Sequence, residues 1–422
     1  AACLEICFFD FSADCYRKVQ LAEKEREMKL TEETPFFFIY SVWTKNGEYR
    51  EQVKRLVTDY DNYISLKLAG DDAYLSEKMV GYPAELDEVY AESFEEQKKE
   101  WFSCVGDGIQ ECRNTWEHKK WNITDFPEFE LAITIDRPEL YYDFLQKDWT
   151  RFCHDYWKNN FLEHHTLSKK RVTRIYIGNQ FCHNLFPRKK LLFQVLEKAL
   201  ENNLAVTLAF TYIRDHLLEE IDELLQELEV WCQSREKEAG KDQEEIIVND
   251  WAMPILLQGK PHLKPVLGVL LNKRRKDVRL PYKHGIGNHV DSLAENNLNC
   301  GFYQDYLKNT FDIQRFEFES CGYKVTIPDG HHSLHLPFFQ TNTSQYCTLY
   351  AVCRYGDRGK QKLPENCPRY CNKKVFLYPK HLKMVGRYNS LFGYDEKILW
   401  DEKQLQDYLE QGIDRIVVNV SL

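Results

Sequence analysis

Four cysteines near the C-terminus have the residue type and the spacing of a metal site. Cys347, Cys353, Cys367 and Cys371 follow the pattern Cys-x5-Cys-x13-Cys-x3-Cys. Four thiolates bind either one tetrahedral zinc ion or one iron–sulfur cluster. Neither pair has the Cys-x2-Cys spacing typical of zinc ribbons, so the spacing favours a [4Fe–4S] cluster, with zinc as the alternative. The interpretation without a metal is four buried free thiols.

A histidine-rich segment lies just before these cysteines. His331, His332 and His335 follow Asp329 and lead directly into the cysteine motif. Imidazoles and a carboxylate this close in sequence are candidates for metal binding or for acid–base catalysis. We expect the segment to be a loop near the active site. The alternative is a polar loop in which one histidine caps a turn.

Two predicted strands end in polar residues. Asn249 and Asp250 close one of them, and Asn179 and His183 close another. In a parallel barrel the C-terminal strand ends surround the active site. We therefore expect Asp250, with Asn249 beside it, to act as a general base or to orient a substrate. The alternative for Asp250 is an N-cap or an Asx turn.

Two carboxylates alternate with phenylalanines on a further predicted strand. Glu317 and Glu319 must lie on the same face of it, because side chains alternate along a strand. Facing into a barrel they would be functional, and facing outward they would be solvated. The basic run that starts at Lys273 and Arg274 is a candidate for meeting an anionic group, although such runs are commonly surface loops.

From residue 171 onward, apolar strands alternate with amphipathic helices. This alternation predicts a parallel sheet, and we expect a TIM-type (β/α) barrel. A doubly wound sheet would place its site similarly, but no Gly-x-Gly-x-x-Gly or phosphate loop follows any strand. The predicted strands are 172–179, 204–210, 245–250, 266–271, 315–319 and 412–418, and the predicted helices lie at 191–200 and 216–233.

Residues 1–170 predict a separate α+β domain of unknown role. Strand-like and helix-like segments alternate there without the regularity of the later part. The domain organisation expected is thus 1–170 and 171–422. The predicted strands of the first part are 35–42, 63–68 and 128–135, and the predicted helices are 48–61 and 138–160.

Composition argues against several classes of protein, without excluding nucleic-acid binding. The 422 residues carry a net charge of −10, so nucleic acid is not expected as a partner on electrostatic grounds. No stretch approaches the ~20 apolar residues of a membrane span, and the N-terminus lacks the pattern of a signal peptide. We therefore expect a cytoplasmic protein that makes no contact with membranes.

The C-terminal part resembles the peptidase U32-like family of TIM-barrel proteins. The segments that carry the similarity begin with Ile-Ile-Val-Asn-Asp-Trp at 246–251 and Leu-Gly-Val-Leu-Leu-Asn-Lys at 267–273. His-Leu-Pro-Phe-Phe at 335–339, Tyr-Asn-Ser-Leu-Phe at 388–392 and Gly-Ile-Asp-Arg-Ile-Val at 412–417 follow in the order typical of the family.

The resemblance covers residues 171–422 and does not extend to 1–170. It implies a barrel with a cysteine-bound [4Fe–4S] cluster, because family members include iron–sulfur proteins linked to oxygen-independent hydroxylation of RNA or ubiquinone precursors. Other members were first described as collagenase-like peptidases. This chain departs from the hydroxylases at Cys371, which follows Cys367 after three residues, whereas their fourth cysteine lies well downstream of the third.

Together these features predict an iron–sulfur TIM-barrel enzyme that modifies a peptide, protein or other macromolecular substrate. The expected reaction is oxygen-independent hydroxylation or related redox chemistry. Two alternatives stay open. One is a U32-type peptidase, although neither Gly-x-Ser-x-Gly nor His-Glu-x-x-His occurs. The other is a non-catalytic binding protein with a structural four-cysteine zinc site. The expected catalytic residues are Asn249, Asp250, His331, His332 and His335.

Overall fold

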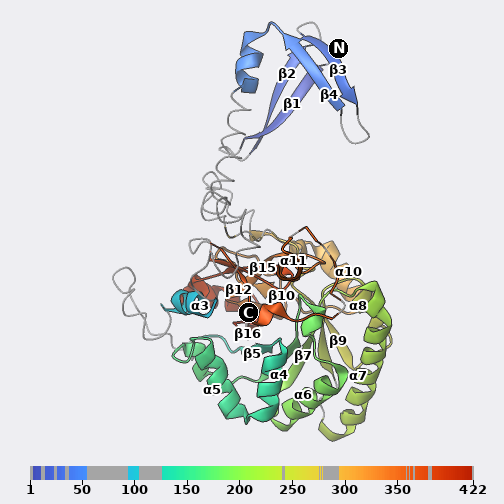
Figure 1. Ribbon diagram of the computed structural model, residues 1–422, viewed down its shortest axis with the longest axis vertical. Coiled ribbons are helices and arrows are strands. Elements are labelled where there is room, and N and C mark those ends of the chain that lie inside the picture. Colours follow the sequence, from blue (N-terminus) through green and yellow to red (C-terminus); the bar gives the residue numbers. More distant parts are fainter. Residues whose placement is uncertain are drawn as a thin grey trace. The chain divides into compact units, whose positions relative to one another are not determined.

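The protein, seen in a computed structural model, divides into two compact units (Figure 1). One comprises Ala1–Val80 with Arg279–Asp291, and the other comprises Gly81–Val278 with Ser292–Leu422. The residues that the structure describes are 3–10, 15–22, 26–33, 38–54, 94–103, 126–239, 243–274, 276, 278, 294–357, 359–360, 362–364, 366–378 and 383–420.

The first unit contains two antiparallel hairpins. The strands β1 (Cys3–Asp10) and β2 (Cys15–Ala22) form one, and β3 (Arg26–Glu33) and β4 (Phe38–Thr44) form the other. A helical segment follows at 47–54, where Asn46 accepts a hydrogen bond from the amide of Tyr49 at 2.9 Å. The strand predicted at 35–42 corresponds to β4, and the strand predicted at 63–68 lies outside the described residues.

The second unit is built on a nearly closed parallel barrel of eight strands flanked by helices. The strands follow one another around the ring in chain order, and β16 pairs with both β11 and β5. A bridge between Leu267 and Phe316 joins β9 to β10. This arrangement is TIM-like. The eight strands are β5 (Glu130–Ile135), β6 (Arg174–Gly178), β7 (Ala205–Ala209), β8 (Glu244–Val248), β9 (Leu263–Leu267), β10 (Glu317–Glu319), β11 (His332–Leu336) and β16 (Ile413–Val418).

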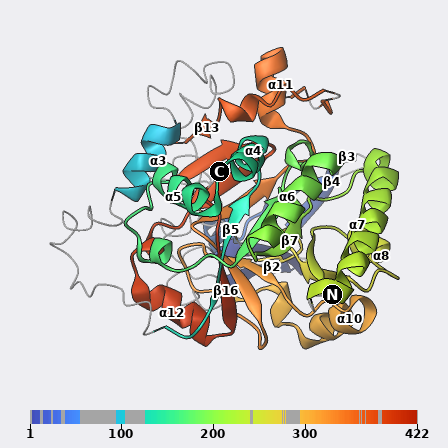
Figure 2. The same cartoon turned by 90° about the horizontal axis from the view of Figure 1, so that it is seen from below.

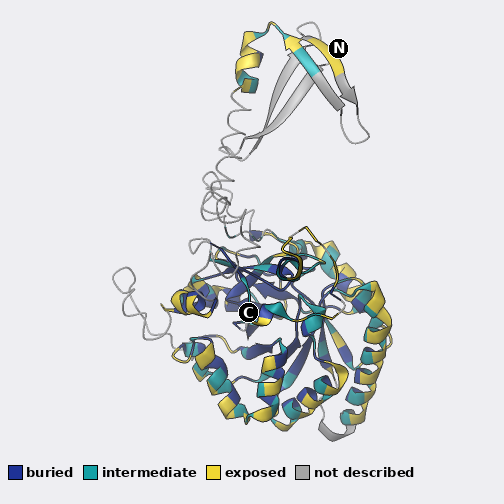
Figure 3. Cartoon of the chain, viewed as in Figure 1, coloured by how far each residue is buried: buried dark blue, intermediate teal, exposed yellow. Residues whose placement is uncertain are grey.

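The helices surround these strands with one face buried and one exposed (Figures 2 and 3). In α6, for example, Leu192, Val195, Leu196 and Ala199 are buried at helical spacing. The helices around the barrel are α4 (Pro138–Gln146), α5 (Trp149–Asn159), α6 (Lys189–Glu201), α7 (Leu218–Ala239), α8 (Ala252–Leu256), α10 (Gly301–Phe311) and α12 (Glu402–Glu410).

The first barrel strand precedes the boundary expected at residue 170. The strand β5 pairs with β6 and β16 and therefore belongs to the barrel sheet. The helix predicted at 138–160 is two helices, α4 and α5. The break lies at Lys147 and Asp148, because the Asp148 side chain accepts a hydrogen bond from the Arg151 amide at 2.9 Å and starts a new helix as its N-cap.

Two further predictions differ from the structure. The strand predicted at 266–271 is β9, which ends at Leu267. The backbone turns there because Gly268 packs against Asn249, and a Cβ at Gly268 would lie 2.2 Å from the Asn249 Oδ1. The histidine segment is also not a loop: His332 to Leu336 form strand β11.

A long insertion separates β11 from β16. It contains an antiparallel sheet in the order β12 (Phe338–Thr343), β15 (Ser390–Tyr394), β14 (Met384–Arg387) and β13 (Phe376–Leu377), together with helix α11 (Thr348–Tyr355). Helix α3 (Phe94–Phe102) packs on this sheet, with Trp101 stacked on Tyr394 at 5.2 Å between ring centroids. The four cysteines predicted as ligands all lie in this insertion.

Candidate functional site

Charged side chains fill the barrel at the N-terminal end of its strands. Arg415 donates to both carboxylate oxygens of Glu245, at 2.6 and 3.0 Å, and to Glu130 at 2.6 Å. Arg174 bonds the same two carboxylates, at 2.9 Å to Glu130 and 3.3 Å to Glu245. Burial alone would raise the pKa of Glu245, but the two arginines lower it to about 2. These four charged side chains pair with one another, and we call them the barrel floor.

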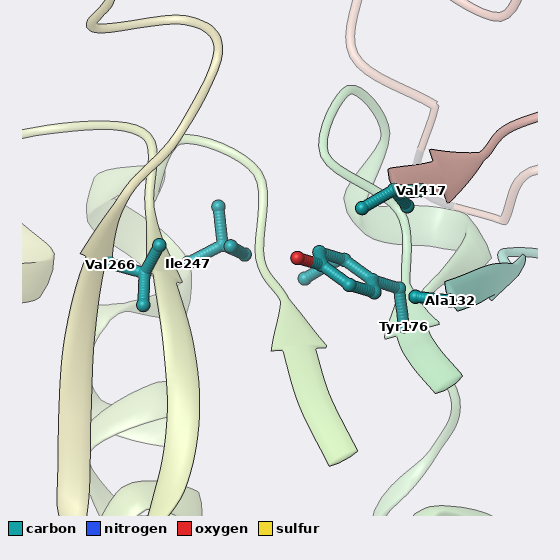
Figure 4. Close-up of a cluster of buried hydrophobic side chains, with 6 residues drawn as sticks. Ala132, Tyr176, Ile247, Val266 and Val417 are labelled. Carbon is teal, nitrogen blue, oxygen red and sulfur yellow. The ribbon is translucent and has the colours of Figure 1, made fainter. Parts of the chain in front are cut away.

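An apolar layer lies above this floor. The ring of Tyr176 extends across the barrel, with Ala132 and Val417 on one side and Ile247 and Val266 on the other (Figure 4). The tyrosine hydroxyl donates to Glu317 at 3.0 Å.

Glu317 also accepts a hydrogen bond from His335, inside the barrel. The His335 Nε2 lies 2.5 Å from the Glu317 Oε2, and neither side chain exceeds 3% exposure. Burial raises the pKa of Glu317, but the bond from His335 and the charge of Arg415 lower it more, so the net shift is downward. An ionised carboxylate that bonds one ring nitrogen fixes the tautomer and orientation of the imidazole.

A cavity of about 40 Å³ lies at the C-terminal end of the strands, beside His335. This volume admits a few water molecules or one small chemical group. Its walls come from most strands of the barrel and from β15. Its polar lining residues are Thr134, Asp136, Asn179, Gln180, Glu319, His335 and Asn419.

Glu319 also faces inward, one position along β10 from the apolar Phe318. It forms a buried ion pair with Lys276 and accepts a hydrogen bond from the amide of Gln340 at 2.7 Å. Arg274 lies next to this pair and donates to the Cys321 Sγ at 2.8 Å. The basic run at Lys273 is therefore partly buried: Lys276 neutralises the Glu319 carboxylate, and Arg274 donates to the Cys321 thiol.

Asn249 connects three loops at the C-terminal end of the barrel. Its amide nitrogen donates to the Phe210 carbonyl at 2.7 Å and to Gln180 at 3.2 Å, and its oxygen accepts from the Leu270 amide at 3.1 Å. All its polar atoms are thus engaged. Asn249 therefore holds the loops after β6, β7 and β9 together, and its role at this end of the barrel is structural.

Asp250 caps the helix that follows it. Its carboxylate accepts from the amides of Ala252 and Met253, at 3.1 and 3.0 Å, and from the amide of Ile213. This is the Asx-turn geometry named above as the alternative to a general base. Asn179 has the same role after β6, where it accepts from the amides of Phe181 and Cys182, both at 2.9 Å.

The structure separates the three histidines expected to act together. His331 is exposed near the N-terminal end of β11 and lies 2.9 Å from Asp414. His332 is buried and stacks on Phe316 at 4.8 Å, and burial lowers its pKa to about 4. His335 alone reaches the cavity, because residues three apart on a strand point to opposite faces.

Three of the four predicted cysteine ligands influence one another electrostatically, together with one that the sequence pattern did not include. Thiol charges that affect Cys347 are those of Cys182, Cys371 and Cys367. Cys182 in turn is affected by Cys371 and Cys367. Cys182 was missed because it lies 165 positions before Cys347 in the chain. The sequence feature that could have indicated Cys182 as a ligand is its position just after the polar residues that end β6.

Contacts between loops explain this arrangement. Phe181, next to Cys182, meets Phe392 of β15 with ring centroids 4.8 Å apart. Tyr212, after β7, donates to the Ser344 carbonyl at 3.1 Å, close before Cys347. The insertion that carries the cysteines is therefore held against the loops at the C-terminal end of β6 and β7.

Burial keeps three of these thiols protonated. Burial raises the pKa of Cys182 to about 12 and that of Cys371 to about 11, and it raises the pKa of Cys347 further. The Cys347 sulfur accepts from the Tyr350 amide at 3.3 Å and contacts the Tyr388 carbonyl at 3.0 Å. Among the described residues, no three histidine, cysteine, aspartate or glutamate side chains are placed to hold a metal ion.

Comparison with known proteins assigns this chain to no family. No family model, curated protein or solved structure matches this chain. Within the part of the chain that the structure describes, no helix combines the length and the apolar character needed to cross a membrane.

Proposed function

We propose that this protein is an iron–sulfur-dependent barrel enzyme of the peptidase U32-like type, with Cys182, Cys347, Cys367 and Cys371 as the cluster ligands. The observation that carries the proposal is the contact between the loop of Cys182 and the insertion that carries the other three cysteines, together with the mutual electrostatic influence of these thiols, at the end of the barrel where parallel barrels place their active sites. This ligand set contains Cys182 in place of Cys353.

The donor set fits a thiophilic centre chemically, but the side chains must reorient to bind one. Burial raises the pKa of the Cys182, Cys347 and Cys371 thiols, so these three are neutral, and thiols become ligands only as thiolates. Binding therefore releases protons, and Cys347 must give up the S–H bond to the Tyr388 carbonyl, whereas a thiolate still accepts from the Tyr350 amide. A bound [4Fe–4S] cluster would supply one-electron transfer at the barrel mouth.

The size of the cavity supports a proposal for the substrate class. A space of about 40 Å³ admits one small group and not a whole small-molecule substrate. We propose that a peptide, protein or other macromolecule lies across the mouth and inserts a single group. Oxygen-independent hydroxylation or related redox chemistry of that group is the proposed reaction.

The test is the metal content of protein purified without oxygen. We expect iron and acid-labile sulfide in equal amounts, brown colour, and no stoichiometric zinc. One zinc per chain without iron or sulfide would instead support a structural zinc site, and cleavage of a peptide panel by metal-free protein would support a peptidase. Protein that takes up neither iron nor zinc on anaerobic reconstitution would overturn the cysteine site altogether.

Single-cysteine variants separate the two possible ligand sets. We expect Cys182→Ala to lose the cluster and Cys353→Ala to retain it. Cys232→Ala is the matched control, because Cys232 is also buried but lies on the outer helix α7. Loss of the cluster in Cys353→Ala with retention in Cys182→Ala would contradict the ligand assignment while leaving the cluster itself intact.

A further inference from the structure

The cavity inside the barrel mouth has two hydrogen-bond acceptors that the protein leaves unused. The first is the Nδ1 of His335. Its Nε2 is bound to Glu317, and no described group bonds the other ring nitrogen, which belongs to a residue that lines the cavity. The second is the Oδ1 of Asp136, which is shielded from solvent and has no hydrogen-bond partner among the described residues.

The remaining polar groups of the lining are largely satisfied within the protein. Asn179 bonds two amides and the Asp136 carbonyl, and Asn419 bonds both the amide and the carbonyl of Phe338. Glu319 is paired with Lys276. A buried acceptor without a donor costs on the order of 1–3 kcal/mol, so the unpartnered Asp136 Oδ1 in a cavity that also holds the His335 Nδ1 indicates a missing donor.

We infer that this cavity binds a small hydrogen-bond donor, an ammonium or hydroxyl group, between His335 and Asp136. The Nδ1 of His335 and the carboxylate of Asp136 each accept one N–H or O–H of the group. The available volume of about 40 Å³ fits the end of a ligand such as a methylammonium or hydroxymethyl group. This site is independent of the cysteines.

The pairing with Glu317 allows His335 to accept a proton from the bound group. When the bound group gives up a proton to Nδ1, the imidazole becomes an imidazolium that keeps its Nε2–H bonded to the Glu317 carboxylate. The positive charge then lies against a buried anion, which stabilises it. His335 is thus the general base of this site, and Glu317 and Tyr176 are positioning residues that hold the ring.

The histidine tautomer is measured by NMR on full-length protein labelled with ¹⁵N-histidine. The His335 signals are those lost in His335→Gln. We expect Nε2 protonated and Nδ1 bare. Methylammonium chloride is then titrated in, with tetramethylammonium chloride at equal concentration as the control that has the same charge but no N–H. Ethylene glycol serves as the hydroxyl probe.

The expected result is a saturable shift of the His335 Nδ1 signal with methylammonium or with ethylene glycol, and none with tetramethylammonium. Whichever of the two probes binds identifies the donor as ammonium or hydroxyl. We expect Asp136→Asn to weaken that binding by about tenfold or more, since a charged hydrogen bond is lost. His331→Gln, at the exposed end of the same strand, should leave it unchanged.

Two results overturn the inference on the wild-type protein alone. One is an Nδ1-protonated His335, which leaves no acceptor facing the cavity. The other is the absence of a saturable shift with either donor probe. Neither result depends on metal content, so failure here and failure of the proposed cluster are distinguished.

Discussion

Replacing Arg415 with methionine tests whether the paired charges at the barrel floor hold the ring of strands together. Arg415 lies on the closing strand β16, and its guanidinium is 3% exposed. It joins three strands by bonding Glu130 of β5 and Glu245 of β8 from its own position on β16. Methionine keeps most of the length of the side chain and removes the charge and the donors.

The expected loss follows from the geometry and the charges. Removing one partner of a buried ion pair costs about 3–5 kcal/mol, because the remaining charge stays buried. The pKa of Glu245 gives a similar figure, since its fall from 4.5 to about 2 is worth about 3 kcal/mol. Arg174 remains beside Glu245, so we expect a loss near the lower end, about 3 kcal/mol in the free energy of unfolding.

The assay is urea unfolding of the full chain at neutral pH and at pH values below 4.5, with hydrogen exchange in β16 to assign the transition to the barrel. In the wild type the contribution of Glu245 is present above pH 4.5 and is lost as the pH falls toward 2. In Arg415→Met this pH dependence should be much smaller. Lys189→Met, which breaks the exposed pair with Glu227, is the control and should cost less than about 1 kcal/mol. A loss in Arg415→Met no larger than in this control would refute the reasoning.

Three further changes follow from single contacts. Gly268→Ala places a Cβ against the Asn249 side chain and should destabilise the protein by about 1–3 kcal/mol in thermal unfolding, and an unchanged melting temperature would contradict the close packing. Burial lowers the pKa of Lys98 to about 7, so wild-type stability should rise between pH 7 and 10.5 by up to about 1.4 kcal/mol per pH unit, and Lys98→Met should lack this rise when the two are compared across that range. Asp148→Ala removes the cap at the start of α5 and should cost about 1 kcal/mol in urea unfolding, whereas a neutral effect would mean that the cap does not determine where α5 begins.

Local pattern predicted most of the barrel. Strands such as β6, β7 and β16 are short apolar runs between helices with regular apolar spacing, and such patterns reflect burial that is decided by neighbours in the chain. The strand β11 escaped prediction because its polar residues Ser333 and His335 face inward and its leucines face the helices. A strand with polar residues facing the barrel and apolar residues facing the helices can be recognised only once the barrel interior is known to contain polar groups.

The order of strands and helices, the spacing of the C-terminal cysteines and the carboxylates on one face of β10 are all visible in the amino-acid sequence. Which of these groups meet depends on the folded chain. It separates His332 from His335, because residues three apart on a strand point to opposite faces, and it leaves His331 exposed near the N-terminal end of β11. It engages Asp250 with backbone amides. It also sets the loop that carries Cys182 against the insertion that carries Cys347, 165 positions later in the chain, where Phe181 meets Phe392. Contacts between such distant segments leave no periodic trace in a single sequence, and for that reason the chemistry at the mouth of this barrel was visible only in the folded chain.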